Sequence, residues 1–193
     1  MDYKYILGAG VILWLLVNNN ESDSSSGGLS SPPLYIGDSH MAVLGPALTT
    51  VTGGSFVTHT GWSMASYLSN GNLPSLVSGY DNVIIELGTN DAVGNPSCQS
   101  LTANVNKLAA ILAGKRVTFI GPPLLDRYDL KPNIQAISDC LKAAAIANGW
   151  RYIASIDFVR SGWYCDSNDS SNCGIHFIPD GYKTWAQGIL QRL

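Results

Sequence analysis

Charged side chains are scarce in this sequence, and positive charge is almost absent from its first half. Asp, Glu, Lys and Arg make up 13% of the 193 residues, about half of the share usual in soluble proteins. Of the eleven Lys and Arg residues only Lys4 precedes Lys107, and the formal net charge is -3. No polybasic stripe is present, so the composition argues against a nucleic-acid partner.

The cysteine spacings typical of metal and redox sites are also missing. None of the four cysteines is separated from another by two residues, which excludes a zinc knuckle or a thioredoxin-like motif. The even number permits two disulfides, for which we expect the pairs Cys165–Cys173 and Cys98–Cys140. The alternative is four buried thiols that behave as small apolar residues. No glycine-rich phosphate loop of the required spacing occurs, so neither a metal nor an organic cofactor is expected.

A long uncharged apolar run occurs at the N-terminus, at residues 5–17 (YILGAGVILWLLV). Thirteen helical residues rise about 20 Å, less than the ~30 Å of a bilayer core, so residues 1–17 are a membrane anchor or a signal-like segment. No small-x-small cleavage site or lipobox cysteine follows, which favours an uncleaved anchor. Since Lys4 precedes the run and no cation follows until Lys107, the positive-inside rule places the rest of the chain outside the cytoplasm, on the periplasmic or extracellular side.

Residues 18–33 have the composition of a flexible linker rich in Asn, Ser and Gly, and residues 34–193 alternate short β-rich runs with helical stretches. This alternation predicts one α/β domain, a parallel five-stranded sheet covered by helices on both faces. The predicted strands are 34–37, 56–59, 82–87, 116–121 and 151–155. The predicted helices are 41–51, 64–68, 101–112, 134–147 and 180–193.

Three polar residues stand where the predicted elements end or begin. Ser39 follows the first strand, Asn90 follows the third, and His176 lies in a loop before the last helix. Taken singly, Ser39 and His176 have ordinary explanations, since a Ser after a strand commonly caps a helix and a loop histidine is usually solvated. Because the carboxyl ends of parallel strands meet at one edge of a sheet, the three can also come together. They would then supply the nucleophile, the base and an oxyanion donor for acyl transfer.

At these positions residues 34–193 resemble the SGNH/GDSL hydrolase family. The family's first block resembles Gly-Asp-Ser at residues 37–39, the second resembles the segment around Gly61, the third resembles Gly-Thr-Asn-Asp at 88–91, and the last resembles the segment ending at His176. The resemblance implies a three-layer α/β/α sandwich of the flavodoxin-like SGNH hydrolase type, here preceded by an N-terminal membrane helix.

The resemblance also implies a role for each of these residues. Ser39 attacks the acyl carbon and His176 takes its proton. The oxyanion is held by the N–H groups of Ser39 and Gly61 and by the side-chain amide of Asn90.

One position departs from the family, in which an Asp usually lies three residues before the catalytic His. Cys173 stands there instead. Three interpretations remain open. A Ser39–His176 dyad can work with its imidazole oriented by a backbone carbonyl, since the third member of a triad moves no proton itself. The chain can have lost activity and kept the fold. Otherwise, a carboxylate comes from elsewhere, from Asp157, Asp166 or Asp169.

Two further histidines and two aromatic residues lie near these motifs. We expect His40 to point away from Ser39, because adjacent helical side chains do not face one another. His59 either lines the substrate pocket or is an exposed turn residue. Trp62 and Tyr67 either stack on a sugar ring or pack in the core.

The sequence therefore predicts a serine ester hydrolase that removes a small acyl group, an O-acetyl in particular, from a cell-wall or surface polysaccharide. One alternative is a lipid or lysophospholipid esterase, which an anchor would hold near a bilayer. The other is a non-catalytic SGNH-fold module with a binding or structural role in an envelope or a virus particle. In a virus particle the protein would be a membrane-associated virion component. The expected partners are an ester substrate and, through residues 1–17, a membrane.

Overall fold

The structure, a computed structural model, describes residues 31–126, 131–159 and 174–193. The predicted anchor at 1–17 and nearly all of the predicted linker lie outside these ranges, as does the predicted Cys165–Cys173 bridge. Within the described ranges, no helix combines the length and the apolar character needed to span a membrane.

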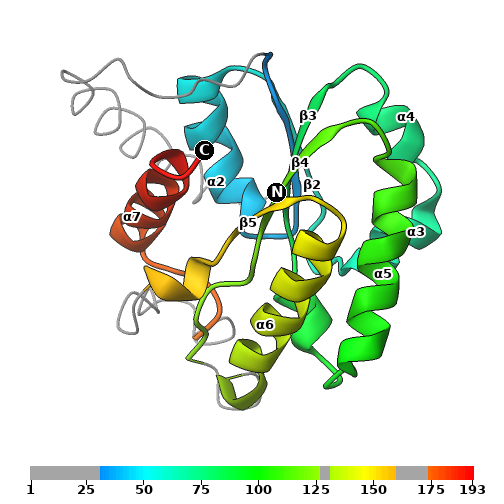
Figure 1. The fold of residues 1–193 in the computed structure, drawn as a ribbon. Helices are drawn as coiled ribbons and strands as arrows, with labels where there is room; N and C mark the ends of the chain where they lie inside the picture. Colours follow the sequence, from blue (N-terminus) through cyan, green and yellow to red (C-terminus); the bar gives the residue numbers. More distant parts are fainter. Residues whose placement is uncertain (1–30, 127–130, 160–173) are drawn as a thin grey trace.

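A five-stranded parallel sheet forms the centre of the domain, in the order β2-β1-β3-β4-β5 (Figure 1). This confirms the predicted sheet. Its strands are β1 (Leu34–Gly37), β2 (Ser55–Thr58), β3 (Asn82–Glu86), β4 (Arg116–Ile120) and β5 (Arg151–Ile153). In the register of the sheet, Gly37 at the end of β1 lies opposite Thr58 of β2 and Glu86 of β3. The turns that follow these three strands therefore start side by side.

Helices cover both faces of the sheet, which gives the three layers seen in Figure 1. One face is covered by α2 (Met41–Thr52) and α7 (Pro179–Leu190). The other is covered by α3 (Met64–Asn70), α4 (Leu73–Val77), α5 (Cys98–Ile111) and α6 (Lys131–Ala147). Two short 3₁₀ helices, η1 (Asn90–Ala92) and η2 (Ser155–Asp157), follow β3 and β5.

Neighbouring strand residues alternate between two hydrophobic clusters, as the period of a β-strand requires. Leu34 and Ile36 of β1 belong to the cluster under α3–α6, whereas Tyr35 between them packs under α2 and α7. Ile84 of β3 faces the second cluster in the same way, between Val83 and Ile85. Burial on both faces explains why these strands are continuous apolar runs.

The structure differs from the sequence prediction mainly at element ends. Helix α4 was not predicted, and α5 begins at Cys98, three residues before the expected start at Leu101. A cap explains the earlier start, since the Ser97 side chain accepts a hydrogen bond from the backbone N–H of Ser100 at 3.1 Å. The predicted disulfide Cys98–Cys140 is present and joins this end of α5 to α6, with the two Cα atoms 5.5 Å apart.

Candidate active site

The turns after β1, β2 and β3 carry the candidate site, and close packing at the end of β1 explains the glycine there. A Cβ atom on Gly37 would lie 2.6 Å from the Cβ of Met41 and 2.9 Å from the carbonyl oxygen of Glu86. No larger residue fits without displacing α2 or β3. Gly37 therefore lets the chain turn sharply from β1 towards α2, with Ser39 in the turn.

Ser39 and His176 meet although 137 residues separate them. The Ser39 Oγ and the His176 Nε2 lie 2.9 Å apart, within hydrogen-bond distance, and both residues are half-buried. Ser39 lies two residues before α2 and His176 three residues before α7, and these two helices pack against each other. In this geometry the imidazole can accept the proton of the hydroxyl as it attacks a carbonyl carbon.

Asn90 lies at the start of the 3₁₀ helix after β3, next in the sheet to the turn of Ser39. Its Nδ2 donates a hydrogen bond of 2.8 Å to the Asp38 Oδ2. A side-chain amide has two N–H groups. This bond engages one of them, and the other can serve an oxyanion.

Gly61 lies on the other side of Ser39, in the turn three residues after β2. It is exposed, its φ is 78°, and a Cβ atom there would meet nothing within 4 Å. A positive φ in this range favours glycine. Gly61 thus provides an accessible stretch of backbone in the turn that follows β2, the strand next to β1.

Three buried carboxyl groups lie beneath these turns: Asp38, Glu86 and Asp91. Burial, together with the charge of Asp91, raises the pKa of Asp38 to about 7, although hydrogen bonds from His40 and Asn90 oppose the shift. Burial and the neighbouring Asp38 raise the pKa of Glu86 well above its ordinary value. Burial raises the pKa of Asp91 to about 6.

These shifts matter because three ionised carboxylates would repel an oxyanion formed above them. The raised pKa of Glu86, which favours its protonated form, limits that charge. Asp91 has a positioning contact of its own, since its carboxylate accepts a hydrogen bond from the backbone N–H of Met64 at the start of α3. Among the residues that the structure describes, no group of three or more His, Cys, Asp or Glu side chains is arranged to hold a metal ion.

His40 does not bond to Ser39, but it also does not point into solvent. It is buried, and its Nδ1 lies 3.0 Å from the hydroxyl oxygen of Tyr182. Its ring packs edge-on against the ring of His176, with centroids 5.3 Å apart, and lies 5.1 Å from the Trp185 ring. Burial, and next the charge of His176, holds the pKa of His40 well below its ordinary value. The sequence contained no signal for this contact between the two imidazoles.

An aromatic stack lies beside Gly61. The rings of His59 and Trp62 are stacked with centroids 3.8 Å apart, and both residues are half-buried. Tyr67 lies under Trp62, is buried, and donates its hydroxyl to the carbonyl oxygen of Gly37 at 2.6 Å. Of the two alternatives stated for these aromatics, core packing holds for Tyr67, whereas His59 and Trp62 keep accessible surface.

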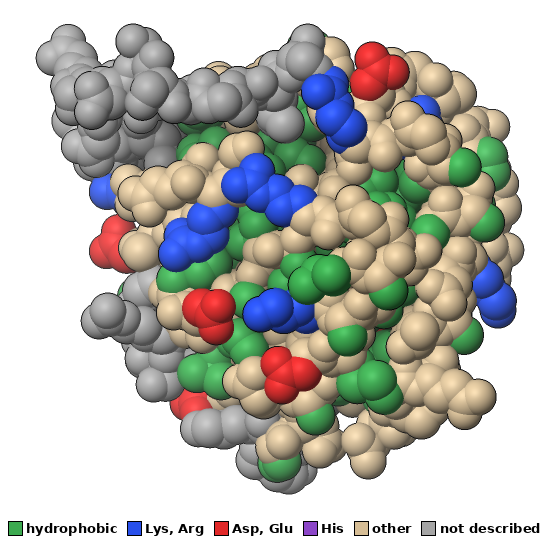
Figure 2. All heavy atoms as spheres, in the orientation of Figure 1, with side chains coloured by type: hydrophobic (Ala, Val, Ile, Leu, Met, Phe, Trp, Pro, Cys, Tyr) green, Lys and Arg blue, Asp and Glu red, His purple; other side chains and the backbone are tan. Residues whose placement is uncertain are grey.

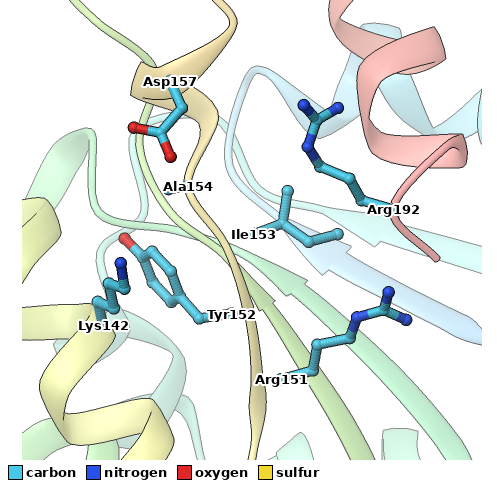
Figure 3. A pocket seen from close by; sticks show the side chains of 7 residues that line it. All are labelled: Lys142, Arg151, Tyr152, Ile153, Ala154, Asp157 and Arg192. Carbon is cyan, nitrogen blue, oxygen red and sulfur yellow. The ribbon is translucent and has the colours of Figure 1, made fainter.

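Asp157, the only candidate orienting acid in the described part of the chain, lines a different feature. It is exposed and lies at a pocket between α6, β5 and the end of α7 with three cations, Lys142, Arg151 and Arg192 (Figure 3). Asp166 and Asp169 lie outside the described residues, as does Cys173. The source of an orienting carboxylate for His176 therefore stays a prediction.

The fold is similar to those of several solved hydrolases. The lipase/acylhydrolase from Enterococcus faecalis matches with a TM-score of 0.68 at 19% identity, over 84% of this chain and 95% of that chain. A member of the lipolytic protein G-D-S-L family from Veillonella parvula matches with a TM-score of 0.61 at 15% identity, over 82% and 96%. A variant of an acetyl-xylooligosaccharide esterase from Geobacillus stearmophilus matches with a TM-score of 0.59 at 13% identity, over 85% and 94%.

No protein-family model and no curated protein matches the sequence. The structural matches nevertheless agree with the motifs at residues 37–39 and 88–91, and the chain has an SGNH/GDSL-like fold. At these low identities the similarity shows the fold alone, so an activity has to be argued from the site.

Proposed function

We propose that this protein is a serine ester hydrolase in which Ser39 is the nucleophile and His176 the general base. The observation that carries the proposal is the 2.9 Å approach of the Ser39 Oγ to the His176 Nε2, at the sheet edge where the turn of Asn90 also starts. A helix-capping serine or a solvated histidine would not require this pairing across 137 residues of sequence.

In the proposed reaction, the Ser39 Oγ attacks the ester carbon while its proton passes to His176. The oxyanion accepts hydrogen bonds from the backbone N–H groups of Ser39 and Gly61 and from the Asn90 amide. His176 then gives the proton to the departing alkoxide, which leaves as the alcohol. A water molecule, deprotonated by His176, attacks the acyl group, and collapse of the second intermediate releases the acid and restores Ser39.

For the substrate we favour a small acyl ester, an O-acetyl group, on a neutral carbohydrate polymer outside the cytoplasm. The accessible His59–Trp62 stack beside Gly61 supports this choice, because sugar rings pack well on aromatic faces. Charged side chains make up only 13% of the chain, which suits an uncharged polymer. On the face drawn in Figure 2, Lys and Arg side chains gather in one part, with hydrophobic and uncharged polar surface around them. One solved hydrolase of similar fold is named an acetyl-xylooligosaccharide esterase. An N-terminal anchor at residues 1–17 would tether the domain near such a polymer.

The nucleophile is tested by labelling the full-length protein with a fluorophosphonate probe, followed by peptide mass spectrometry. We expect an adduct on Ser39 that is absent in Ser39→Ala and strongly reduced in His176→Ala, with a loss of roughly 10⁴-fold or more in kcat for either variant. A folded wild-type protein without an adduct would reject the esterase and favour a non-catalytic module.

The substrate class is tested with Trp62→Ala. For an acetylated xylo-oligosaccharide, the loss of one stacking contact should raise KM roughly 2- to 10-fold. The hydrolysis of p-nitrophenyl acetate, which has no sugar ring, should change little. Equal effects on both substrates, or faster release of fatty acid from lysophosphatidylcholine than of acetate, would contradict a carbohydrate ester.

A further inference from the structure

We propose that Asp38 is the positioning residue of the oxyanion hole, because its carboxylate and its carbonyl group connect the three turns that carry Ser39, Gly61 and Asn90. This inference rests on the proposed function and adds to it a residue that orients the oxyanion donors without touching the substrate. Asp38 is fully buried.

The two carboxylate oxygens bind two different turns. The Asp38 Oδ1 accepts a hydrogen bond of 2.9 Å from the backbone N–H of His40, which closes the turn around Ser39. The Asp38 Oδ2 accepts the hydrogen bond of 2.8 Å from the Asn90 Nδ2. One side chain thus fixes both the backbone that presents the Ser39 N–H and the amide that completes the hole.

The main-chain carbonyl of Asp38 reaches the third turn. It accepts a hydrogen bond from the hydroxyl of Thr58, the last residue of β2. The next residue, His59, donates its backbone N–H to the carbonyl oxygen of Gly37 at 3.1 Å. These two bonds hold the start of the segment that leads to Gly61 against the end of β1.

The acceptor character of the carboxylate decides which way the Asn90 amide faces. A side-chain amide can rotate by half a turn and exchange its N–H₂ group for its carbonyl oxygen. With Asp38 as a neighbour, only the orientation with Nδ2 towards the carboxylate forms a hydrogen bond, whereas the other would oppose two oxygens. If the amide rotated, its carbonyl oxygen would lie where the second N–H now points, and it would repel an oxyanion.

Glu86 helps to keep Asp38 ionised. The Glu86 carboxyl is fully buried next to Asp38 and holds its proton to a much higher pH than usual, because burial and the Asp38 charge both raise its pKa. Burial raises the pKa of Asp38 to about 7, and the N–H groups of His40 and Asn90 oppose this shift because they favour the charged form. At pH 8 Asp38 is therefore mostly an acceptor, and this is the pH at which its role is best measured.

The test is a double-mutant cycle in the full-length protein at pH 8, with p-nitrophenyl acetate as substrate. Asp38→Asn keeps the size of the side chain but turns an N–H₂ group towards one of the two donors. We expect Asn90→Ala to lower kcat roughly 100- to 1000-fold. Asp38→Asn should lower kcat roughly 10- to 100-fold with little change in KM. In the Asn90→Ala background the factor by which Asp38→Asn lowers kcat should be at least fivefold smaller, because the two residues act together.

Asn82→Ala is the control for the loss of a buried polar side chain at the opposite end of β3. It removes the hydrogen bonds of 2.7 and 2.8 Å that the Asn82 Nδ2 donates to Ser31, so it should lower the midpoint of urea denaturation while kcat changes less than about threefold. Equal effects of Asp38→Asn in the two Asn90 backgrounds would overturn the proposal, as would a loss of kcat in Asn82→Ala as large as that in Asp38→Asn.

A measurement on the wild-type protein keeps the proposal testable if Asp38→Asn does not fold. The side-chain amide of Asn90, assigned in an NMR spectrum by its absence in Asn90→Ala, should exchange one hydrogen with solvent more than tenfold slower than exposed Asn95. Equally fast exchange of both residues would overturn the positioning role. A wild-type protein with a protected Asn90 amide and no adduct on Ser39 would instead reject the proposed hydrolase and leave the contact intact.

Discussion

The two faces of the sheet differ in the side chains that pack near the candidate base. Under α3, α4, α5 and α6, which we call the aliphatic face, the core is mainly aliphatic, and the disulfide between α5 and α6 lies on this side. Under α2 and α7, which we call the aromatic face, aliphatic residues share the core with three rings that contact one another, Phe177, Tyr182 and Trp185. His40 lies among these rings and contacts His176.

This difference bears on how the candidate base is held in a sequence that has Cys173 at the position where the SGNH/GDSL family that it resembles usually has an aspartate. On the aromatic face, the rings of Phe177 and Trp185 pack against His40, and the His40 ring in turn contacts the ring of His176. Dense packing allows few alternative positions for such flat side chains. We therefore expect substitutions on the aromatic face to affect both stability and catalysis, and substitutions on the aliphatic face to affect stability alone.

The largest effect is expected from Trp185→Ala, compared with Leu108→Ala on the opposite face. Both side chains are buried, so the loss of unfolding free energy should be about 3–5 kcal/mol for Trp185→Ala and about 2–5 kcal/mol for Leu108→Ala. Urea denaturation measures these losses. In the folded fraction kcat should fall at least tenfold for Trp185→Ala only, because Trp185 supports His40. A matching fall for Leu108→Ala would remove the distinction between the faces.

The next effect concerns the disulfide on the aliphatic face. Replacing Cys98 and Cys140 together by Ser opens a link between residues 42 apart in sequence, and the entropy that the unfolded chain regains should lower stability by roughly 2–4 kcal/mol. The kcat of the folded double variant should stay within about twofold of the wild type. A larger drop at unchanged folded fraction would mean that α5 and α6 also control the site.

A smaller effect is expected from two tyrosine hydroxyls, one on each face. Tyr182→Phe leaves the His40 Nδ1 without the hydroxyl it now bonds, whereas after Tyr67→Phe the carbonyl oxygen of Gly37 keeps the hydrogen bond from the His59 N–H. In a denaturation experiment the first change should cost about 1–3 kcal/mol and the second about 0.5–1.5 kcal/mol. Only Tyr182→Phe should also move the acid limb of the pH profile of kcat/KM, since His40 contacts the proposed base. An identical shift of the acid limb in Tyr67→Phe would argue against an effect of Tyr182 on His176 through His40.

The smallest effect is a pH dependence, and its sign differs between the buried carboxyls and His40. The pKa of Asp38 is raised to about 7, so its contribution to stability is complete below the unfolded pKa near 4 and is lost as the pH rises through 7. His40 has a lowered pKa, so its contribution is present above about 6.5 and is lost as the pH falls.

The variant Asp38→Asn removes the titration of this carboxyl, whereas His40, Glu86 and Asp91 remain titratable in both proteins. From pH 6 to pH 7 the unfolding free energy of the variant should gain about 1 kcal/mol relative to the wild type, as measured by urea denaturation at each pH. A relative change of the opposite sign would show that Asp38 is ionised more easily in the folded protein than in the unfolded chain.

The α/β class, the five strands and the edge of the sheet at which the candidate site lies follow from the pattern of residues along the chain. Short apolar runs separated by helical stretches can bury their side chains only as a parallel sheet between two helical layers. The carboxyl ends of such strands share one edge, so Ser39 and Asn90 had to be close. The disulfide Cys98–Cys140 was one of the alternatives that the sequence left open, and the structure confirms it. The predicted start of α5 was wrong because a side-chain cap determines it.

The surroundings of the candidate residues, in contrast, depend on how the folded layers pack. The bonds from Asp38 to Asn90 and from His40 to Tyr182, and the approach of His176 to Ser39, join segments 52 to 142 residues apart. No local preference encodes such distances. They follow from how α2 and α7 pack on one face of the sheet and how three neighbouring strands end in register, and these are properties of the assembled layers rather than of any single segment.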